Sequence, residues 1–256
     1  MKIVRTKMPV MGVVTAGLAM LAITIVGPAD AQSLRPHATS APVAAGGIQS
    51  IPLPAPKNFV RHVTNRYFPL KPGTKWIYEG YGADEGERII TKVLKRTKKI
   101  SGIKATVVLD VATLDGEVIE RTHDWYAQDK WGRVWYLGEA TTKFEDGTTS
   151  TAGSWKHGVD GASAGIQMFK RGRLNQPYYQ EFLAGEAEDQ GELLSRRMRA
   201  VVPTGDYRHV WMTKDTTQLE PEVVELKLYA PGVGLVLEVG TSPDQSGAEL
   251  VGFKRG

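Results

Sequence analysis

Three turns built on Asp and Gly divide the middle of the chain into short extended segments. They are Asp115-Gly116, Asp129-Lys130-Trp131-Gly132 and Asp146-Gly147. Asp and Gly reach the positive φ angles that tight hairpin turns require, whereas most residues do so only at a cost. A chain interrupted in this way is therefore restricted to antiparallel hairpins, and long helices are excluded from this region.

The segments between such turns have the period of β-strands. Residues 74–81 alternate, with Trp76 and Tyr78 on one face, and only an extended chain places every second side chain on one side. Further candidate strands, each bounded by Gly, Pro or Asp, are 105–114, 117–126, 133–137, 178–183, 193–202, 207–214, 223–230, 234–239 and 249–253. The pattern predicts an all-β fold with little helix, an antiparallel meander that forms a curved half-barrel, a barrel or a sandwich.

The two-residue turn at Asp115-Gly116 also predicts a strand register. It sets Arg121 opposite Asp110 and Glu120 opposite Val111, so that one of the two pairs is complementary in charge. The next turn is expected to bring Trp135 beside Tyr126.

The first 31 residues have the features of a secretory signal peptide. Lys2, Arg5 and Lys7 precede an uncharged apolar stretch at 8–26, and Ala29-Asp30-Ala31 is a small-residue cleavage signal. We expect an exported protein, located in the periplasm or outside the cell, with no stable membrane span after processing. A leader retained as a membrane anchor is the alternative, since the apolar stretch approaches the length that crosses a bilayer.

The rest of the chain is predicted to contain a linker and one domain. Cleavage leaves Gln32 at the N-terminus, residues 32–56 form a Pro- and Ala-rich linker that we expect to be disordered, and residues 57–256 form a single β domain. The absence of cysteine excludes disulfides and a lipid-modified cysteine. Much of the formal charge of +4 lies in the leader, so no electrostatic argument favours nucleic acid as a partner.

Several sequence blocks carry a resemblance to known proteins. They are FPLKPGTKWIYEG at 68–80, DWYAQD at 124–129, VWYLGE at 134–139 and APGVGLV at 230–236. In this order they resemble a family of uncharacterised secreted bacterial proteins, from about Tyr67 to the C-terminus. The Pro-Gly-Thr-x-Trp-x-Tyr opening is also similar to lipocalin-like envelope proteins. The resemblance implies a curved sheet around a central space and no particular activity.

A serine motif suggests hydrolysis, but its context does not. Gly161-Ala162-Ser163-Ala164-Gly165 matches a nucleophile elbow, and Asp206 and His209 follow in the order that such hydrolases use. An elbow needs a buried strand before the serine and a helix after it, whereas the residues before Ser163 are polar and Gly172 closes any helix early. A glycine-rich turn is the preferred interpretation, and no catalytic residue is assigned.

An acidic segment offers a possible calcium site. Glu186, Glu188 and Asp189 are crowded together, and calcium prefers several oxygen ligands. A solvated turn is the alternative, because runs of charge usually face water. Paired carboxylates can also hydrolyse glycosides, which requires a fixed separation that sequence does not show.

The aromatic residues supply candidate ligand contacts. Trp76, Tyr78, Trp131 and Trp135 are the candidates, because aromatic side chains line apolar and sugar-binding concavities as well as cores. Core packing is the alternative for most of them. Trp131 differs because an indole at the tip of a turn is hard to bury and is available to a partner.

Three functional hypotheses follow from these patterns. The first is an exported, non-catalytic envelope or secreted protein that binds a small apolar or amphiphilic ligand in a curved sheet, or an envelope component. The second is a structural or interaction module, and the third is a hydrolase that uses carboxylates or Ser163. A deep cavity favours the first, a filled core the second, and a cleft with two close carboxylates the third.

Overall fold

The computed structural model describes residues 48, 50–241 and 246–256. The predicted signal peptide, its cleavage site and most of the predicted linker lie outside these residues. Within them, no helix has the length and apolar character needed to cross a bilayer.

The described chain is almost entirely strand. The strands are β1 (Thr64–Asn65), β2 (Phe68–Pro69), β3 (Lys75–Tyr81), β4 (Glu87–Ile100), β5 (Ile103–Leu114), β6 (Glu117–Gln128), β7 (Val134–Glu145), β8 (Thr148–Ser150), β9 (Trp155–Lys156), β10 (Ser163–Met168), β11 (Tyr178–Tyr179), β12 (Glu181–Phe182), β13 (Asp189–Val202), β14 (Gly205–Thr217), β15 (Val224–Ala230), β16 (Gly234–Gly240) and β17 (Gly247–Lys254). Two single-turn 3-10 helices, Pro56–Asn58 and Gly82–Asp84, are the helical elements of this part of the chain. The predicted all-β fold is confirmed.

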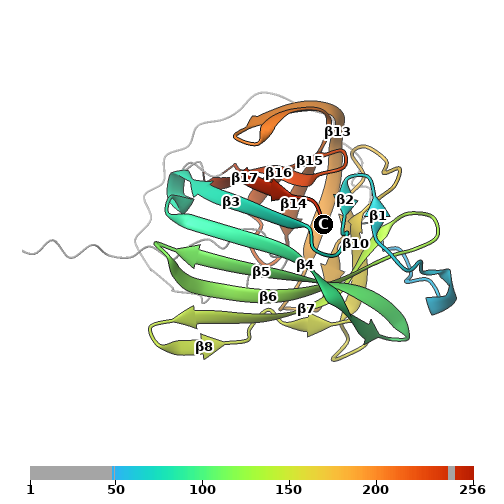
Figure 1. The fold of residues 1–256 in the computed structure, drawn as a ribbon. Coiled ribbons are helices and arrows are strands. Elements are labelled where there is room, and N and C mark those ends of the chain that lie inside the picture. Colours follow the sequence, from blue (N-terminus) through green and yellow to red (C-terminus); the bar gives the residue numbers. More distant parts are fainter. Residues whose placement is uncertain (1–47, 49, 242–245) are drawn as a thin grey trace, which may run out of the picture.

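Fifteen of the strands form one antiparallel sheet that curls into a nearly closed barrel, and β1 and β2 form a separate two-stranded sheet (Figure 1). Strands β3 to β7 follow one another as a meander, strands β13 to β17 form a second meander, and β17 pairs with β3 to join them. The extended stretch at 178–182 connects the two outer strands, because β11 pairs with β13 and β12 pairs with β10. Of the three architectures that the sequence left open, the barrel is therefore the one adopted.

The closure depends on a glycine in β10. A Cβ atom on Gly165 would lie 2.3 Å from the backbone oxygen of Tyr179, far inside van der Waals contact. Only glycine lets the two backbones approach this closely, and that approach brings β10 against the closing segment.

The predicted turns are confirmed by their backbone angles. Asp115 and Gly116 have φ values of 51° and 87°, and Asp146 and Gly147 have 48° and 76°. Positive φ at both central residues is the requirement of a type I′ hairpin turn, which matches the right-handed twist of the flanking strands.

The predicted register beyond the first turn is wrong by one residue. A β-bulge leaves Ile119 unpaired, so that Arg121 lies opposite Val111 and Glu120 opposite Ala112. The expected pair of Arg121 with Asp110 does not form. Because a one-residue shift moves a side chain to the other face, Asp110 faces the barrel interior whereas Arg121 faces outward.

The second expected neighbour pair is also corrected. Tyr126 lies opposite Tyr136, and Trp135 lies opposite Ala127. Trp135 therefore belongs to the outer face of the sheet, where a second apolar cluster forms around Ile103, Trp125 and Trp135.

The second cluster is covered by the segment that precedes the barrel. Ile51, Leu53 and Phe59 pack against it, and the rings of Phe59 and Trp135 meet edge to face with centroids 6.5 Å apart. Residues 105–108 of β5, 124–128 of β6 and 134–139 of β7 are thus buried on both faces of the sheet. Residues 51–56, the end of the predicted linker, belong to the described and packed part of the chain.

Candidate binding cavity

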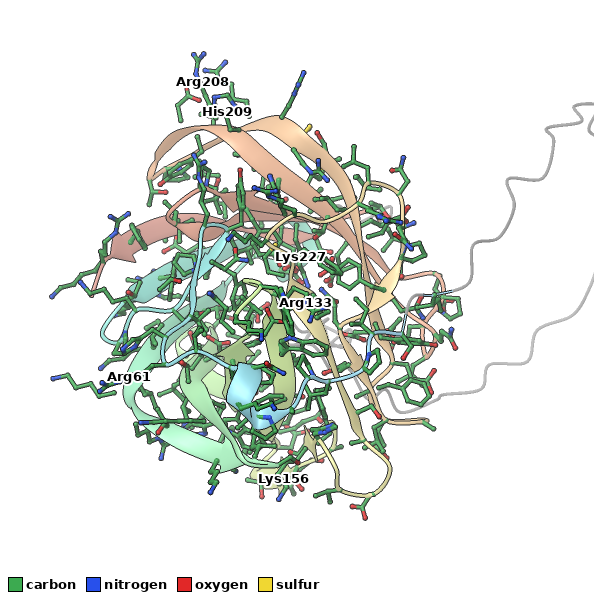
Figure 2. The ribbon with its side chains drawn as sticks, turned by 90° about the vertical axis from the view of Figure 1, so that its right-hand side faces the viewer. Arg61, Arg133, Lys156, Arg208, His209 and Lys227 are labelled. Carbon is green, nitrogen blue, oxygen red and sulfur yellow. The ribbon has the colours of Figure 1, made fainter. Side chains whose placement is uncertain are left out.

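The segment at 63–70 crosses one end of the barrel and plugs it. The backbone N–H of Leu70 donates to the carbonyl of Val63, which folds the segment back on itself as the β1–β2 pair. The ring of Tyr67 stacks on Trp211 of β14 at a centroid distance of 4.2 Å. Figure 1 shows β1 and β2 at this end of the barrel, and Figure 2 looks onto that end.

A cavity of about 80 Å³ lies beneath the plug, inside the ring of strands. Its aromatic lining consists of Phe68, Trp76, Tyr78, Tyr126 and Tyr229. Its charged lining consists of Asp110, Asp215 and Lys227, and Figure 2 labels Lys227 within the outline of the barrel. The space has room for several water molecules or a small ligand group.

Three of the cavity rings form a connected group. Phe68 of the plug meets Tyr126 edge to face at a centroid distance of 5.1 Å and lies tilted to Tyr229 at 6.4 Å. These distances fall in the range where aromatic pairs attract each other, so the plug and two opposite strands hold one another in place.

The other two rings are anchored through their polar atoms. Trp76 Nε1 donates to the carbonyl of Val233 at 2.8 Å, and the hydroxyl of Tyr78 donates to the carbonyl of Leu235 at 3.1 Å. Because these polar atoms already have partners, both side chains offer mainly their ring carbons to the cavity.

Asp110 is the acidic group with a free oxygen in the cavity lining. The residue is 8% exposed, and its Oδ1 accepts no hydrogen bond from any described residue. Burial raises the pKa of Asp110 to about 6, although the Thr91 hydroxyl and the Asp124 carboxyl lower it in part. Asp110 is therefore mainly ionised at pH 7, in surroundings that solvate it poorly.

The neighbouring carboxyl of Asp124 is affected more strongly. Burial and the charge of Asp110 raise the pKa of Asp124 well above its usual range. Its Oδ1 accepts a hydrogen bond from the hydroxyl of Tyr136 at 2.6 Å, and Tyr136 also contacts Glu139 at 2.8 Å. Two interacting acids lose their protons in separate steps, so Asp124 keeps its proton when Asp110 has lost its own.

Lys227 is already neutralised by its own set of carboxylates. Its Nζ lies 3.0 Å from Glu225, 3.3 Å from Asp215 and 3.8 Å from Glu238. Burial lowers the pKa of Lys227, but the three acids together raise it well above the usual value, so the side chain stays charged. Asp215 is further held by the hydroxyl of Thr213 at 2.8 Å.

Acids outnumber bases inside the barrel. Burial raises the pKa of further interior carboxyls, namely Glu139, Glu181, Asp189 and Glu238. Among the residues that line the cavity, by contrast, Lys227 is the single cationic side chain. Because a raised pKa keeps such carboxyls largely protonated, they add little negative charge to the interior at neutral pH.

The structure brings two of the four predicted aromatic contacts into the cavity. Trp76 and Tyr78 line it. Trp131 lies at the tip of the β6–β7 turn and is 50% exposed, with Lys130 Nζ 4.9 Å and Arg133 Cζ 5.1 Å from its ring centroid. Trp135 is fully buried in the outer cluster, where its Nε1 donates to Asp129 Oδ2 at 2.9 Å.

The predicted calcium ligands do not converge on a common point. Glu186 is exposed, Glu188 accepts a hydrogen bond from the backbone of Gly185 at 2.9 Å, and Asp189 is largely enclosed in β13 with a pKa raised by burial to about 7. Within 48, 50–241 and 246–256, no group of three or more His, Cys, Asp or Glu side chains is placed to hold a metal ion. Calcium binding here stays a prediction.

Ser163 is the exposed first residue of β10, a strand that is otherwise largely buried. It pairs with Phe182 of β12, and among the described residues its hydroxyl makes no hydrogen bond to Asp206 or His209. Asp206 instead accepts two hydrogen bonds from Arg199, each 2.8 Å long, on the β13–β14 hairpin. Figure 2 shows His209 on this hairpin at the edge of the molecule.

Sequence reasoning missed the residues that give the cavity its chemistry. Asp110 carried a usable signal, because it stands on the same strand face as the apolar residues Val108 and Ala112. Lys227 carried a weaker one, because it stands on the same strand face as the buried Tyr229. A charge on an otherwise buried face indicates a partner or a function, but the off-by-one register hid the signal at Asp110.

Comparisons with known proteins give two remote structural similarities. No family model and no curated protein matches the chain. A candidate lipoprotein from Parabacteroides distasonis matches with 14% identity and a TM-score of 0.42, over 74% of this chain and 99% of that one. A candidate exported protein with a YmcC-like fold from Bacteroides fragilis matches with 13% identity and a TM-score of 0.41, over 75% of this chain and 100% of that one. Similarities of this size carry no conclusion about function.

Proposed function

We propose that this chain is an exported, non-catalytic protein that binds a small amphiphilic ligand inside its barrel. The observation that carries the proposal is the cavity of about 80 Å³, which Asp110 lines together with several aromatic rings. Binding sites are commonly concave and apolar with a few polar groups that orient the ligand. Export rests on the leader at 1–31.

The size of the cavity limits the ligand. A space of about 80 Å³ admits a small molecule or the head group of a larger one. A long apolar chain fits only after displacement of the plug at 63–70, which Tyr67 and Phe68 hold through ring contacts.

The other two hypotheses account for the cavity less well. A purely structural module needs no internal space lined by unpaired polar atoms. A carboxylate hydrolase needs two available carboxyl groups, but Asp215 is already bound to Lys227 and Thr213, which leaves Asp110 alone with a free oxygen in this lining.

Native mass spectrometry of protein recovered from the exported fraction tests the proposal. We expect a bound small molecule on the unmutated protein and its loss in Val108→Phe, which fills the cavity from β5. Leu235→Phe is a milder second filling variant in case the first does not fold. Val118→Phe is the matched control, because Val118 is exposed on the neighbouring strand β6. Equal occupancy in the folded filling variants and in the control would overturn the proposal.

A further inference from the structure

The position of Asp110 in the cavity lining indicates what kind of ligand the cavity takes. A carboxylate that burial keeps from water is costly even with a few hydrogen-bond partners, so a bound ligand that supplies positive charge or N–H donors is favoured there. Asp110 is 8% exposed, lines the cavity and keeps Oδ1 without a described partner. Asp110 is thus a poorly solvated acid in the cavity lining, and the Thr91 hydroxyl and the Asp124 carboxyl offset its burial only in part.

The protein's own cation is not available to fill this role. Lys227 lines the same cavity, but Glu225 and Asp215 lie within 3.3 Å of its Nζ and Glu238 lies slightly farther away. A charge shared among three carboxylates has little attraction left for a fourth. The cavity therefore has a net negative side at Asp110, and a cation from outside complements it.

The aromatic rings that line the cavity with Asp110 also favour a cation. Phe68, Tyr126 and Tyr229 form the connected aromatic group in the cavity. The face of an aromatic ring carries partial negative charge and attracts alkylated ammonium groups, most strongly where water is excluded. A carboxylate and several rings together suit an organic cation, whose methyl groups contact the rings while its charge meets the carboxylate.

We propose that the cavity binds a small organic cation, an ammonium or methylated ammonium group, paired with the Asp110 carboxylate and enclosed by Phe68, Tyr126 and Tyr229. This proposal rests on the proposed binding function and names its ligand class. A bare metal ion fits less well, because no group of three or more potential ligands converges within the described residues.

Titration of the full exported chain with simple ammonium salts tests the ligand class. The probes are methylammonium and tetramethylammonium chloride, with sodium chloride as the ionic-strength control and tert-butanol as a neutral molecule of similar shape. Calorimetry and melting curves at pH 8 in an amine-free buffer provide the readouts. We expect saturable binding and a raised Tm for at least one ammonium salt, and neither for the two controls.

Two variants locate the site. Asp110→Asn keeps the shape and removes the charge, so we expect affinity to fall at least about tenfold. Phe68→Leu keeps an apolar side chain and removes the ring, so we expect a loss of about 5- to 30-fold. Asp206→Asn, which changes an exposed acid on the β13–β14 hairpin, is the matched control and leaves affinity unchanged.

The outcomes separate this inference from the proposed function. Equal affinity of Asp110→Asn and unmutated protein, or tert-butanol binding as tightly as the ammonium salts, overturns the cation proposal. If native mass spectrometry still shows a cavity ligand in that case, the binding function stands with a different ligand class. If no ammonium salt binds and no ligand is found in the cavity, both proposals fail.

Discussion

Replacement of Asp110 by Asn should stabilise the protein at high pH and have little effect at low pH. Burial raises the pKa of Asp110 from 3.8 to about 6, so the folded state binds this proton more tightly than the unfolded state. The stability that comes from tighter proton binding in the folded state is fully present below pH 3.8, and it is lost as pH rises through about 6. Asn cannot ionise, so the Asp110→Asn variant does not lose stability in this way as pH rises.

The expected size follows from the two pKa values. Their difference corresponds to about 3 kcal/mol of unfolding free energy at pH 8, where Asp110 is ionised in both states. At pH 4 the difference is below about 1 kcal/mol, because the carboxyl is largely protonated in the folded state. As pH rises from 4 to 8, the unfolding free energy of Asp110→Asn should increasingly exceed that of the unmutated protein.

Urea unfolding followed by tryptophan fluorescence at pH 4, 6 and 8 measures this change. Acetate and phosphate buffers are suitable, since an organic amine is itself a candidate ligand. The control is Asp206→Asn, because the hydrogen bond from Arg199 lowers the pKa of Asp206 and its ionised form supports folding. We expect that control to gain nothing at pH 8.

The reasoning is refuted if Asp110→Asn is less stable than the unmutated protein at pH 8, or if its advantage is the same at pH 4 and pH 8. Either result means that Asp110 is not an ionised, poorly solvated carboxylate in the free protein.

Three further predictions test the barrel and the rejected serine site. Gly165→Ala should cost about 1–3 kcal/mol in chemical unfolding, because its Cβ would meet the Tyr179 oxygen at 2.3 Å, and unchanged stability would contradict the closure described for β10. Trp135→Phe should cost about 2–4 kcal/mol by the same measurement, since it leaves a space in the outer cluster and removes a donor from Asp129, while its ligand affinity should be unchanged. Ser163→Ala should leave unfolding free energy within about 0.5 kcal/mol and any measured activity unchanged, and the loss of an esterase activity would show that the turn interpretation is wrong.

Local patterns predicted the elements of this fold well. The turns at Asp115-Gly116 and Asp146-Gly147 were predicted because the sign of φ depends on the residue itself and its immediate neighbours. The strand containing Trp76 and Tyr78 was predicted because alternation is a property of a single segment. These two aromatic residues are also the part of the cavity that the sequence identified.

Features that involve pairs of strands were predicted less well. The bulge at Ile119 shifted the register, and this placed Asp110 inside the barrel although the sequence paired it with Arg121. Trp135 has the same residue type as Trp76 but lies on the other face of the sheet. Neither difference is visible in composition or period, because both depend on which strand lies alongside.

The sequence by itself predicted a secretory leader and determined a cysteine-free all-β chain and the positions of its turns, because each of these depends on residues close together in the chain. Only the tertiary structure decided that the sheet closes through the stretch at 178–182, and that Phe68, Asp110 and Tyr229 meet around one cavity. These residues are far apart in sequence, and their proximity arises from the pairing of β17 with β3 and from the plug. The raised pKa of Asp110 is likewise a tertiary property, since it comes from burial that other strands provide.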